Sequence, residues 1–258
     1  MSLTLTPLPN IPLIQQGDDL GKTTLMALER AEITLLDGDV IVIAQKIVSK
    51  AEGRLVNLDD VEPSPEALNL ALSTEKDPRL VEMILRESKQ VLRTRPGTII
   101  VEHRLGFICA SAGIDHSNVK EPSAWLQKGA EWVLLLPEDP DASACRIRQQ
   151  LQEASGAQLG VLIIDSHGRA WRLGTVGISI GLAGIPGIID LRGQPDLFDF
   201  KLQITEVGAA DELAAAASLM MGQAAEGTPV VHVRGFPYAL RNSSLKELLR
   251  PGEMDLFR

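Results

Sequence analysis

Two aspartates follow apolar runs of strand length, and this position suits ligands of a divalent cation. Asp115 comes shortly after the run 107–110, behind a turn-like Ser-Ala-Gly. Asp165 directly follows the run 161–164, and Ser166 adds a hydroxyl beside it. A carboxylate at the end of a buried strand is held rigidly, and Mg²⁺ and Mn²⁺ prefer oxygen ligands. The same positions also suit Asx turns that end strands, so position alone leaves both interpretations open.

Two further stretches have the residue types of a phosphate or ligand loop. Lys50 lies in the stretch 48–54 after another apolar run, where Gly53 would let a backbone approach a phosphate. A solvated charged turn is the alternative for this stretch. The stretch 221–227 ends a helical pattern, and Gly222 suits the C-cap of that helix as well as a ligand loop.

Neither of two glycine patterns has the spacing of a known nucleotide motif. The Gly-Lys-Thr that begins at Gly21 resembles the end of a P-loop, but Gln16 stands where the first glycine must be. Gly177, Gly181 and Gly184 are spaced GxxxGxxG rather than GxGxxG. We expect these three glycines in strands and turns, where glycine allows close backbone approach.

The cysteines and histidines indicate no zinc site, catalytic triad or disulfide framework. Cys109 and Cys145 are the 2 cysteines, and we expect them as reduced thiols that pack like small apolar side chains. No HExxH spacing occurs among the 4 histidines, which are His103, His116, His167 and His232.

Composition and charge favour an ordinary cytoplasmic enzyme that acts on small molecules. Hydrophobic residues make up 45% of the chain and charged residues 23%. The net charge of −9 argues against a nucleic-acid partner, while a few local cations can still hold a nucleotide. The N-terminus lacks a secretory pattern, and no apolar run approaches the roughly 20 residues of a membrane span.

The elements that would position these residues alternate irregularly along the chain. Strand-like runs occur at 40–43, 98–101, 107–110, 132–136, 161–164, 175–180 and 230–233. Helical patterns occur at 18–31, 78–88, 141–153 and 210–221. We expect Asp77 and Asp141 as the caps of the second and third helices, and an inserted surface loop at 121–131. This order predicts antiparallel or mixed sheets rather than one doubly wound parallel sheet.

Read together, several segments resemble the coenzyme F420-0:L-glutamate ligase family. They occur in the family's order from near residue 11 to near residue 235. The matching stretches are 11–14, 17–20, 48–54, 112–119, 139–141, 164–169, 210–213, 221–222 and 233–235.

The resemblance implies a GTP-dependent ligase that joins L-glutamate to coenzyme F420-0, a deazaflavin precursor, through an acyl phosphate. Members can add further γ-linked glutamates, and two Mg²⁺ or Mn²⁺ sites are expected. The implied nucleotide-binding residues are Ile11, Pro12, Leu13, Ile14, Gln45, Lys46, Lys50, Asn118, Met221, Gly222, Gln223, Ala224, Ala225, Glu226, Gly227 and Thr228. The implied metal ligands are Asp115, Asp165, Ser166 and Gln223.

Gln223 departs from the family pattern, because archaeal members have glutamate there as a ligand of the second metal. An amide oxygen can still bind the cation but carries no charge, so the second site is expected to be weaker. Glu226 lies nearby in the sequence and could compensate.

The resemblance also implies an α+β fold of mixed or antiparallel sheets with flanking helices, in an intertwined homodimer. We expect residues 1–258 to form one such unit, with two interlocked subdomains as an alternative. Three other functions stay open: a ligase for another phosphorylated carboxylic-acid acceptor, a non-catalytic nucleotide-binding protein, and a metal-dependent nucleotide hydrolase.

Overall fold

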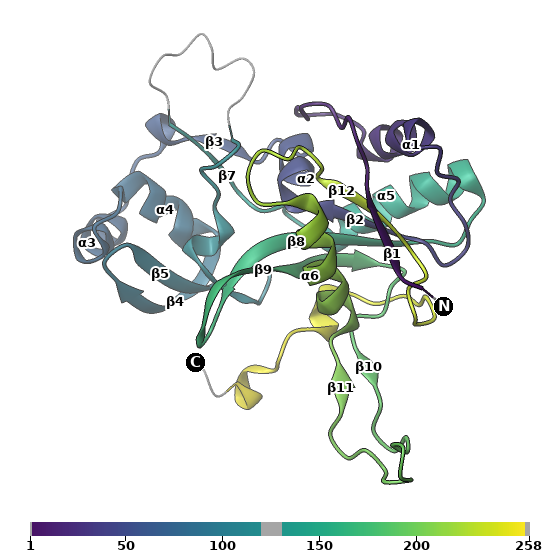
Figure 1. Cartoon of the computed structure of the whole chain (residues 1–258). Coiled ribbons are helices and arrows are strands. Elements are labelled where there is room, and N and C mark those ends of the chain that lie inside the picture. The colour runs from purple at the N-terminus through teal and green to yellow at the C-terminus, as the bar shows by residue number, and fades with distance from the viewer. Residues whose placement is uncertain (1, 120–130, 256–258) are drawn as a thin grey trace.

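The computed structural model describes residues 2–119 and 131–255, and a five-stranded mixed sheet lies at its centre (Figure 1). The strand order is β1 (Thr4–Pro7), β12 (Val230–Arg234), β2 (Val40–Ala44), β8 (Gly160–Arg169) and β9 (Arg172–Ala183). Strands β2 and β8 run parallel, and the other neighbours pair antiparallel. The first four residues of β2 are buried, as is typical of a strand covered on both faces.

Helices pack on both faces of this sheet. Helix α5 (Pro140–Ser155) lies against Gly181 of β9, where a Cβ atom would be 2.5 Å from the Pro140 carbonyl carbon. Helix α6 (Ala209–Met221) lies against Gly177 of the same strand, where a Cβ atom would be 2.5 Å from the Ala214 oxygen. The register of β8 against β9 shifts between these two glycines, so they face different helices. Helix α1 (Leu20–Arg30) packs on α5.

A smaller three-stranded antiparallel sheet stands beside the central one, at the left of Figure 1. It contains β4 (Ser88–Arg95), β5 (Thr98–His103) and β6 (Ile108–Ala110). Helices α3 (Pro65–Thr74) and α4 (Pro78–Arg86) pack with it. The pair β3 (Leu55–Asn57) and β7 (Trp132–Leu134) and the short helix α2 (Gln45–Ala51) lie between the two sheets.

A narrow arm projects from the body of the molecule (Figure 1). Its base is the strand pair β10 (Ile189–Asp190) and β11 (Glu206–Val207). Four large apolar side chains on the arm are strongly exposed, namely Leu197, Phe198, Phe200 and Ile204. Short 3-10 turns are η1 (Leu58–Asp60), η2 (Ser111–Gly113), η4 (Leu245–Glu247) and η5 (Gly252–Met254).

The α+β class and the mixed sheet confirm the prediction from sequence, and one predicted cap is wrong. Asp77 caps α4 and Gly222 is the C-cap of α6, as expected. The cap of α5 is Asp139, because Pro140 takes the first helical position. Asp141 instead accepts the backbone N–H groups of Leu182 and Leu245.

Two other segments singled out from sequence are the stretch 48–54 and the expected loop at 121–131. The stretch that suited a charged turn forms helix α2 through Ala51, and only its end is a turn. Of the predicted surface loop, residues 121–130 lie outside the described part of the chain. Within residues 2–119 and 131–255, no helix combines the length and apolar character needed to cross a membrane.

Candidate functional site

A cleft of about 310 Å³ lies between strand β8 of the central sheet and strand β6 of the three-stranded sheet. Six of the residues singled out from sequence line it, from four separate segments of the chain. The lining residues are Lys46, Cys109, Ala110, Gly113, Ile114, Asp115, Ser117, Asn118, Asp165, Ser166, His167, Gly168, Thr175 and Gln223. The structure therefore brings all four predicted metal ligands together in one cavity.

The start of α2 holds the Asp115 carboxylate from both sides. Gln45 donates its amide N–H to Asp115 Oδ2 at 2.6 Å, and Lys46 Nζ lies 2.7 Å from Asp115 Oδ1. Ser49, one turn along the helix, donates its hydroxyl to Gln45 Oε1 at 2.9 Å and fixes the orientation of the Gln45 side-chain amide. Gln45 and Ser49 are buried, so this side of the cleft is rigid.

The Asp165 carboxylate lies inside β8 rather than at its end, which corrects the prediction from sequence. The strand continues to Arg169, so Asp165 and His167 are two residues apart and point to the same face. His167 Nε2 is 2.9 Å from Asp165 Oδ2, and the His167 ring is buried against Phe107. His167 is a residue to which the sequence assigned no role, because the strand was expected to stop at Ile164.

The two carboxylates have pKa values shifted in opposite directions. Burial raises the pKa of Asp115, and the Asp165 carboxylate adds to this, while Lys46 opposes it. Burial also raises the pKa of Asp165, but the contacts with His167 and the Ser166 N–H outweigh it and lower that pKa. Burial and the Asp165 charge raise the pKa of the Cys109 thiol to about 12, so this thiol stays protonated at neutral pH.

The oxygen donors of the cleft suit a hard cation that also binds phosphate. Mg²⁺ is usually held by one or two carboxylates together with substrate phosphates, which matches Asp115 and Asp165. Ser166 and Gln223 add neutral oxygens to the same cavity. In the described ranges, no three His, Cys, Asp or Glu side chains come close enough to form a metal cage by themselves.

Hydrogen bonds join three segments along one side of the cleft. Lys50 Nζ on α2 donates to the Asn118 carbonyl at 2.6 Å, and Asn118 donates its amide N–H to the Ala224 carbonyl at 3.0 Å. Burial and the nearby Lys46 charge lower the pKa of Lys50. The predicted nucleotide residues Lys50, Asn118 and Ala224 are thus connected, although their sequence positions are far apart.

The loop after α6 is shaped by its own side chains. Gly222 has a φ of +73°, and a Cβ there would be 2.2 Å from the Glu226 carboxyl carbon. Glu226 accepts the Ala224 N–H at 2.8 Å, and it is not among the described residues that line the cleft. Gln223 does line it and donates its amide N–H to Ser218 Oγ at 3.0 Å. The compensation of Gln223 by Glu226 stays a prediction.

The loop that contains Ile11, Pro12, Leu13 and Ile14 borders α2 but does not line the cleft. Ile14 is buried, while Leu13 is 83% exposed. Just beyond them, Gly17 donates its N–H to the Ala51 carbonyl at the end of α2, at 2.9 Å. Gly21 lies within α1 against Gln150, which agrees with the absence of P-loop spacing.

Ser117 is another cleft residue to which the sequence gave no role. Lys46 Nζ contacts both the Ser117 hydroxyl and carbonyl oxygens at 3.2 Å. The segment 112–119 was singled out as a whole, but the contact depends on how α2 faces it. Sequence spacing does not contain that information.

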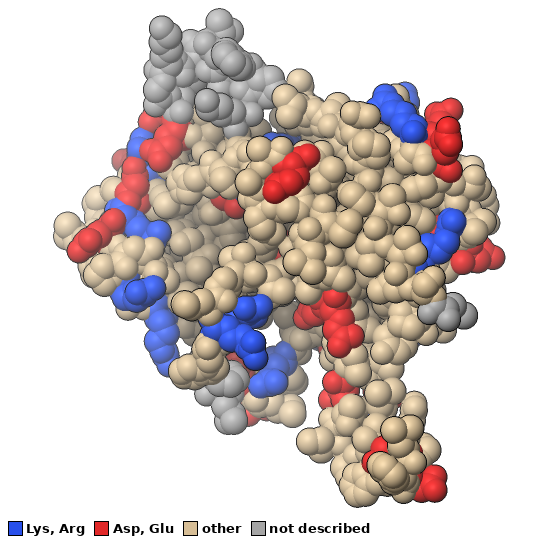
Figure 2. Space-filling model, viewed as in Figure 1, with Lys and Arg blue, Asp and Glu red and all other residues tan. Residues whose placement is uncertain are grey.

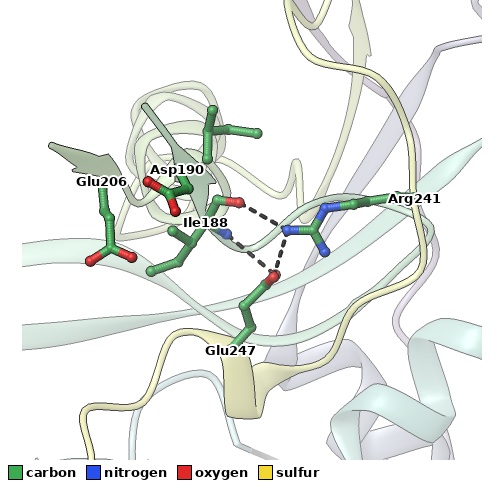
Figure 3. Close-up of a pocket in the computed structure, with 6 residues that line it drawn as sticks. Ile188, Asp190, Glu206, Arg241 and Glu247 are labelled. Carbon is green, nitrogen blue, oxygen red and sulfur yellow. Dashed lines mark hydrogen bonds and ion pairs between the residues drawn. The ribbon is translucent and has the colours of Figure 1, made fainter. Parts of the chain in front are cut away.

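A second cavity, of about 400 Å³, lies at the base of the arm (Figure 3). Its lining residues are Ile188, Ile189, Asp190, Glu206, Arg241 and Glu247. Figure 3 shows Glu247 turned toward Arg241 and the Ile188 backbone, with Arg241 Nη2 2.5 Å from Glu247 Oε1. Arg241 pairs with Glu247, and Asp190 and Glu206 both pair with Arg192 beside the cavity. Because its charged groups already have partners, we place the candidate site in the first cleft.

Comparison with known proteins points to one family. The F420-0:Gamma-glutamyl ligase family matches residues 9–235. A Coenzyme F420:L-glutamate ligase from Methanothermobacter thermautotrophicus is 48% identical over 100% of both chains. A protein of the same name from Methanopyrus kandleri is 44% identical over 100% of this chain and 98% of its own length. Another from Methanocaldococcus jannaschii is 41% identical over 96% of this chain and 94% of its own length. Such full-length similarity means that the chain belongs to the F420-0:Gamma-glutamyl ligase family.

Proposed function

We propose that this protein joins L-glutamate to the carboxylate of coenzyme F420-0, with GTP and a divalent cation as co-reactants. The observation that carries the proposal is the convergence of Asp115, Asp165, Ser166 and Gln223 in one cleft beside Lys46. The family description names F420-0, and the names of the relatives give coenzyme F420 and L-glutamate, which supports this acceptor and this amino acid.

In the proposed reaction, GTP activates the acceptor before the amide bond forms. A carboxylate oxygen of the acceptor attacks the γ-phosphorus, and GDP leaves. The amine nitrogen of glutamate then attacks the acyl carbonyl carbon, loses a proton, and expels inorganic phosphate. The first step turns a poor electrophile into one with a good leaving group.

The residues of the cleft have separate tasks in this proposal. Asp115, Asp165 and Ser166 would hold one cation, and Gln223 would contribute to a second, weaker site. Lys46 and Lys50 would place positive charge beside the triphosphate, and Asn118 would keep the adjoining loop in position. A bound divalent cation would neutralise the negative charge that builds up on the phosphates.

The test is mass spectrometry of the deazaflavin precursor after incubation with the protein, GTP, Mn²⁺ and L-glutamate. We expect one or more glutamyl additions with the native chain. The Asp165→Ala variant should lose product formation by about 100-fold or more, because it loses a charged oxygen ligand at the reacting phosphate. Asp60→Ala is the matched control, since it removes an exposed carboxylate that does not line the cleft.

The outcomes separate the alternatives. Product formation with another carboxylic acid but not with F420-0 would mean that the acceptor is a different compound. Nucleotide binding without any product would indicate a non-catalytic protein. GTP cleavage that ignores both glutamate and acceptor would indicate a hydrolase.

A homodimer is also part of the proposal. It is supported by the family membership and by the apolar side chains that the arm exposes. We expect the arm to pack against the second copy of the chain.

A further inference from the structure

The β8–β9 hairpin continues outward beyond the cleft. Gly168 and Thr175 line the cleft and pair with each other across the hairpin. The next pair outward is Arg169 with Arg172, and the chain turns between them. The end of the hairpin, residues 169–173, therefore adjoins the reacting site but is not needed to form it.

This end presents aromatic and apolar surface. Trp171 is 88% exposed and Leu173 is 97% exposed. Trp171 also has a φ of +64°, a left-handed conformation that is unusual for a bulky residue. Glycine or asparagine would fit this turn position with less strain, so the tryptophan adds backbone strain here.

The same hairpin end carries two arginines, Arg169 and Arg172. In the described part of the chain, neither Arg169 nor Arg172 forms an ion pair, whereas Arg54, Arg79, Arg104 and Arg234 all do. Arg169 instead reaches across the turn and donates to the Leu173 carbonyl at 3.1 Å. Figure 2 shows Lys and Arg side chains gathered around this end of the hairpin. On a chain of net charge −9, such a local patch favours an anionic ligand.

We propose that residues 169–173 are the binding platform for the deazaflavin ring of the acceptor. The inference rests on the proposed function, because it concerns the acceptor of that reaction. A deazaflavin is a flat aromatic ring system, and such rings stack well on tryptophan. The two arginines would attract negative charge on the acceptor beside the ring.

The length of the hairpin agrees with an extended acceptor. Arg169, the last residue of β8, is four residues beyond Asp165, which at roughly 3.3 Å per residue is on the order of 13 Å, and Trp171 lies in the turn beyond it. An acceptor with its ring at one end and its carboxylate at the end of a flexible side chain can span this range. The ring is then held at the hairpin end while the carboxylate lies among the cleft residues.

The test compares Trp171→Ala with Trp171→Phe in steady-state kinetics and in calorimetric titration with the deazaflavin precursor. We expect Trp171→Ala to raise the KM and Kd for the acceptor about tenfold or more, because a stacking partner is lost. Trp171→Phe keeps an aromatic ring and should recover most of the affinity. The KM for GTP and for glutamate should stay unchanged in both variants. Leu72→Ala is the matched control, since Leu72 is 82% exposed on α3.

If the KM and Kd for the acceptor stay unchanged in Trp171→Ala, the proposal that residues 169–173 bind the deazaflavin ring is wrong. Arg172→Ala is a second variant that keeps the test decisive if the tryptophan variants misfold, and it should weaken acceptor binding without changing the KM for GTP. Failure of the proposed function looks different, because the native protein would then bind the precursor without converting it. The titrations would still show whether Trp171 contributes to that binding.

Discussion

Glu87 is a buried carboxylate outside the cleft that contacts three basic side chains. Its Oε2 lies 2.9 Å from Arg54 Nη2, 2.9 Å from Arg104 Nε and 3.7 Å from His103 Nε2. His103 stacks on Phe107, which in turn packs against His167 in the cleft. Glu87 therefore supports, through packed rings, the wall that holds His167.

The Glu87 contacts predict a loss of stability in acid. Burial raises the pKa of Glu87, but the contacts with His103, Arg104 and Arg54 outweigh it and lower that pKa from 4.5 to about 2. The ionised group thus stabilises the fold above pH 4.5, and this contribution is lost as the pH falls toward 2. We expect it to be on the order of 3 kcal/mol.

Urea unfolding of the native chain and of Glu87→Gln measures this contribution. The variant should be clearly less stable at pH 7, and the difference should narrow as the pH falls through 4 to 3. Glu66→Gln, on the exposed side of α3, is the control and should follow the native curve. A difference that does not change with pH would contradict the assignment.

The identities of the main cleft residues could be predicted from sequence, but their contacts could not. Asp115, Asp165, Ser166 and Gln223 were expected together because ordered segments resemble a family. The ion pair of Lys46 with Asp115 joins residues 69 positions apart. Such a contact depends on how two elements face each other, which no local pattern encodes.

At the scale of elements, apolar runs predicted the positions of strands β8 and β9 but not where β8 ends. The apolar runs 161–164 and 175–180 located both strands correctly. Beyond Ile164 the residues turn polar, so the strand was expected to end there. Tertiary pairing carries it five residues further, because each residue from Asp165 to Arg169 finds a partner in β9.

The missed helix α3 had a readable local signal. Ser64 caps it through the Ala67 N–H, and Pro65 occupies the first turn. This combination of cap and proline is typical of a helix start. Its apolar pattern is weak, because only a few of its residues face the core.

Close contact at Gly181 predicts an intolerant position. A Cβ atom there would lie 2.4 Å from Pro140 Cβ and 2.6 Å from the Pro140 oxygen. Since backbone atoms cannot yield, Gly181→Ala should force α5 away from the sheet and cost about 2 kcal/mol or more. Denaturant unfolding measures this loss.

Gly168→Ala is the matched control on the partner strand. Nothing lies within 4 Å of its added Cβ, so its free energy of unfolding should stay near the native value. Equal stability of the two variants would show that the packing of α5 on β9 is looser than described.

At the scale of the whole molecule, the arm exposes a group of large apolar side chains. Leu197 is 96% exposed and Phe198 is 88% exposed, and large apolar patches of this kind mark interaction surfaces. The sequence placed no element here, because the arm's strands β10 and β11 have two residues each. The overall class could be predicted, whereas this projection could not, because such short strands leave no periodic apolar pattern to read.

We expect light scattering after size-exclusion chromatography to show a dimer for the native chain. The double variant Leu197→Ser with Phe198→Ser should weaken association on the order of 100-fold, because two apolar side chains lose their burial. Leu72→Ser, an equally exposed change on α3, should leave the dimer intact. A native chain that is monomeric at every concentration would contradict the proposal.

The parallel pairing of β2 with β8 has a consequence for how the chain folds. Ala44 pairs with Ile164, so Gln45 and Asp165 become neighbours although 120 residues separate them. Loop closure over such a distance is slow, because its entropy cost comes before the contacts that stabilise the closed chain. The cleft therefore cannot assemble ahead of the central sheet during refolding, and recovery of activity reports completion of the whole fold.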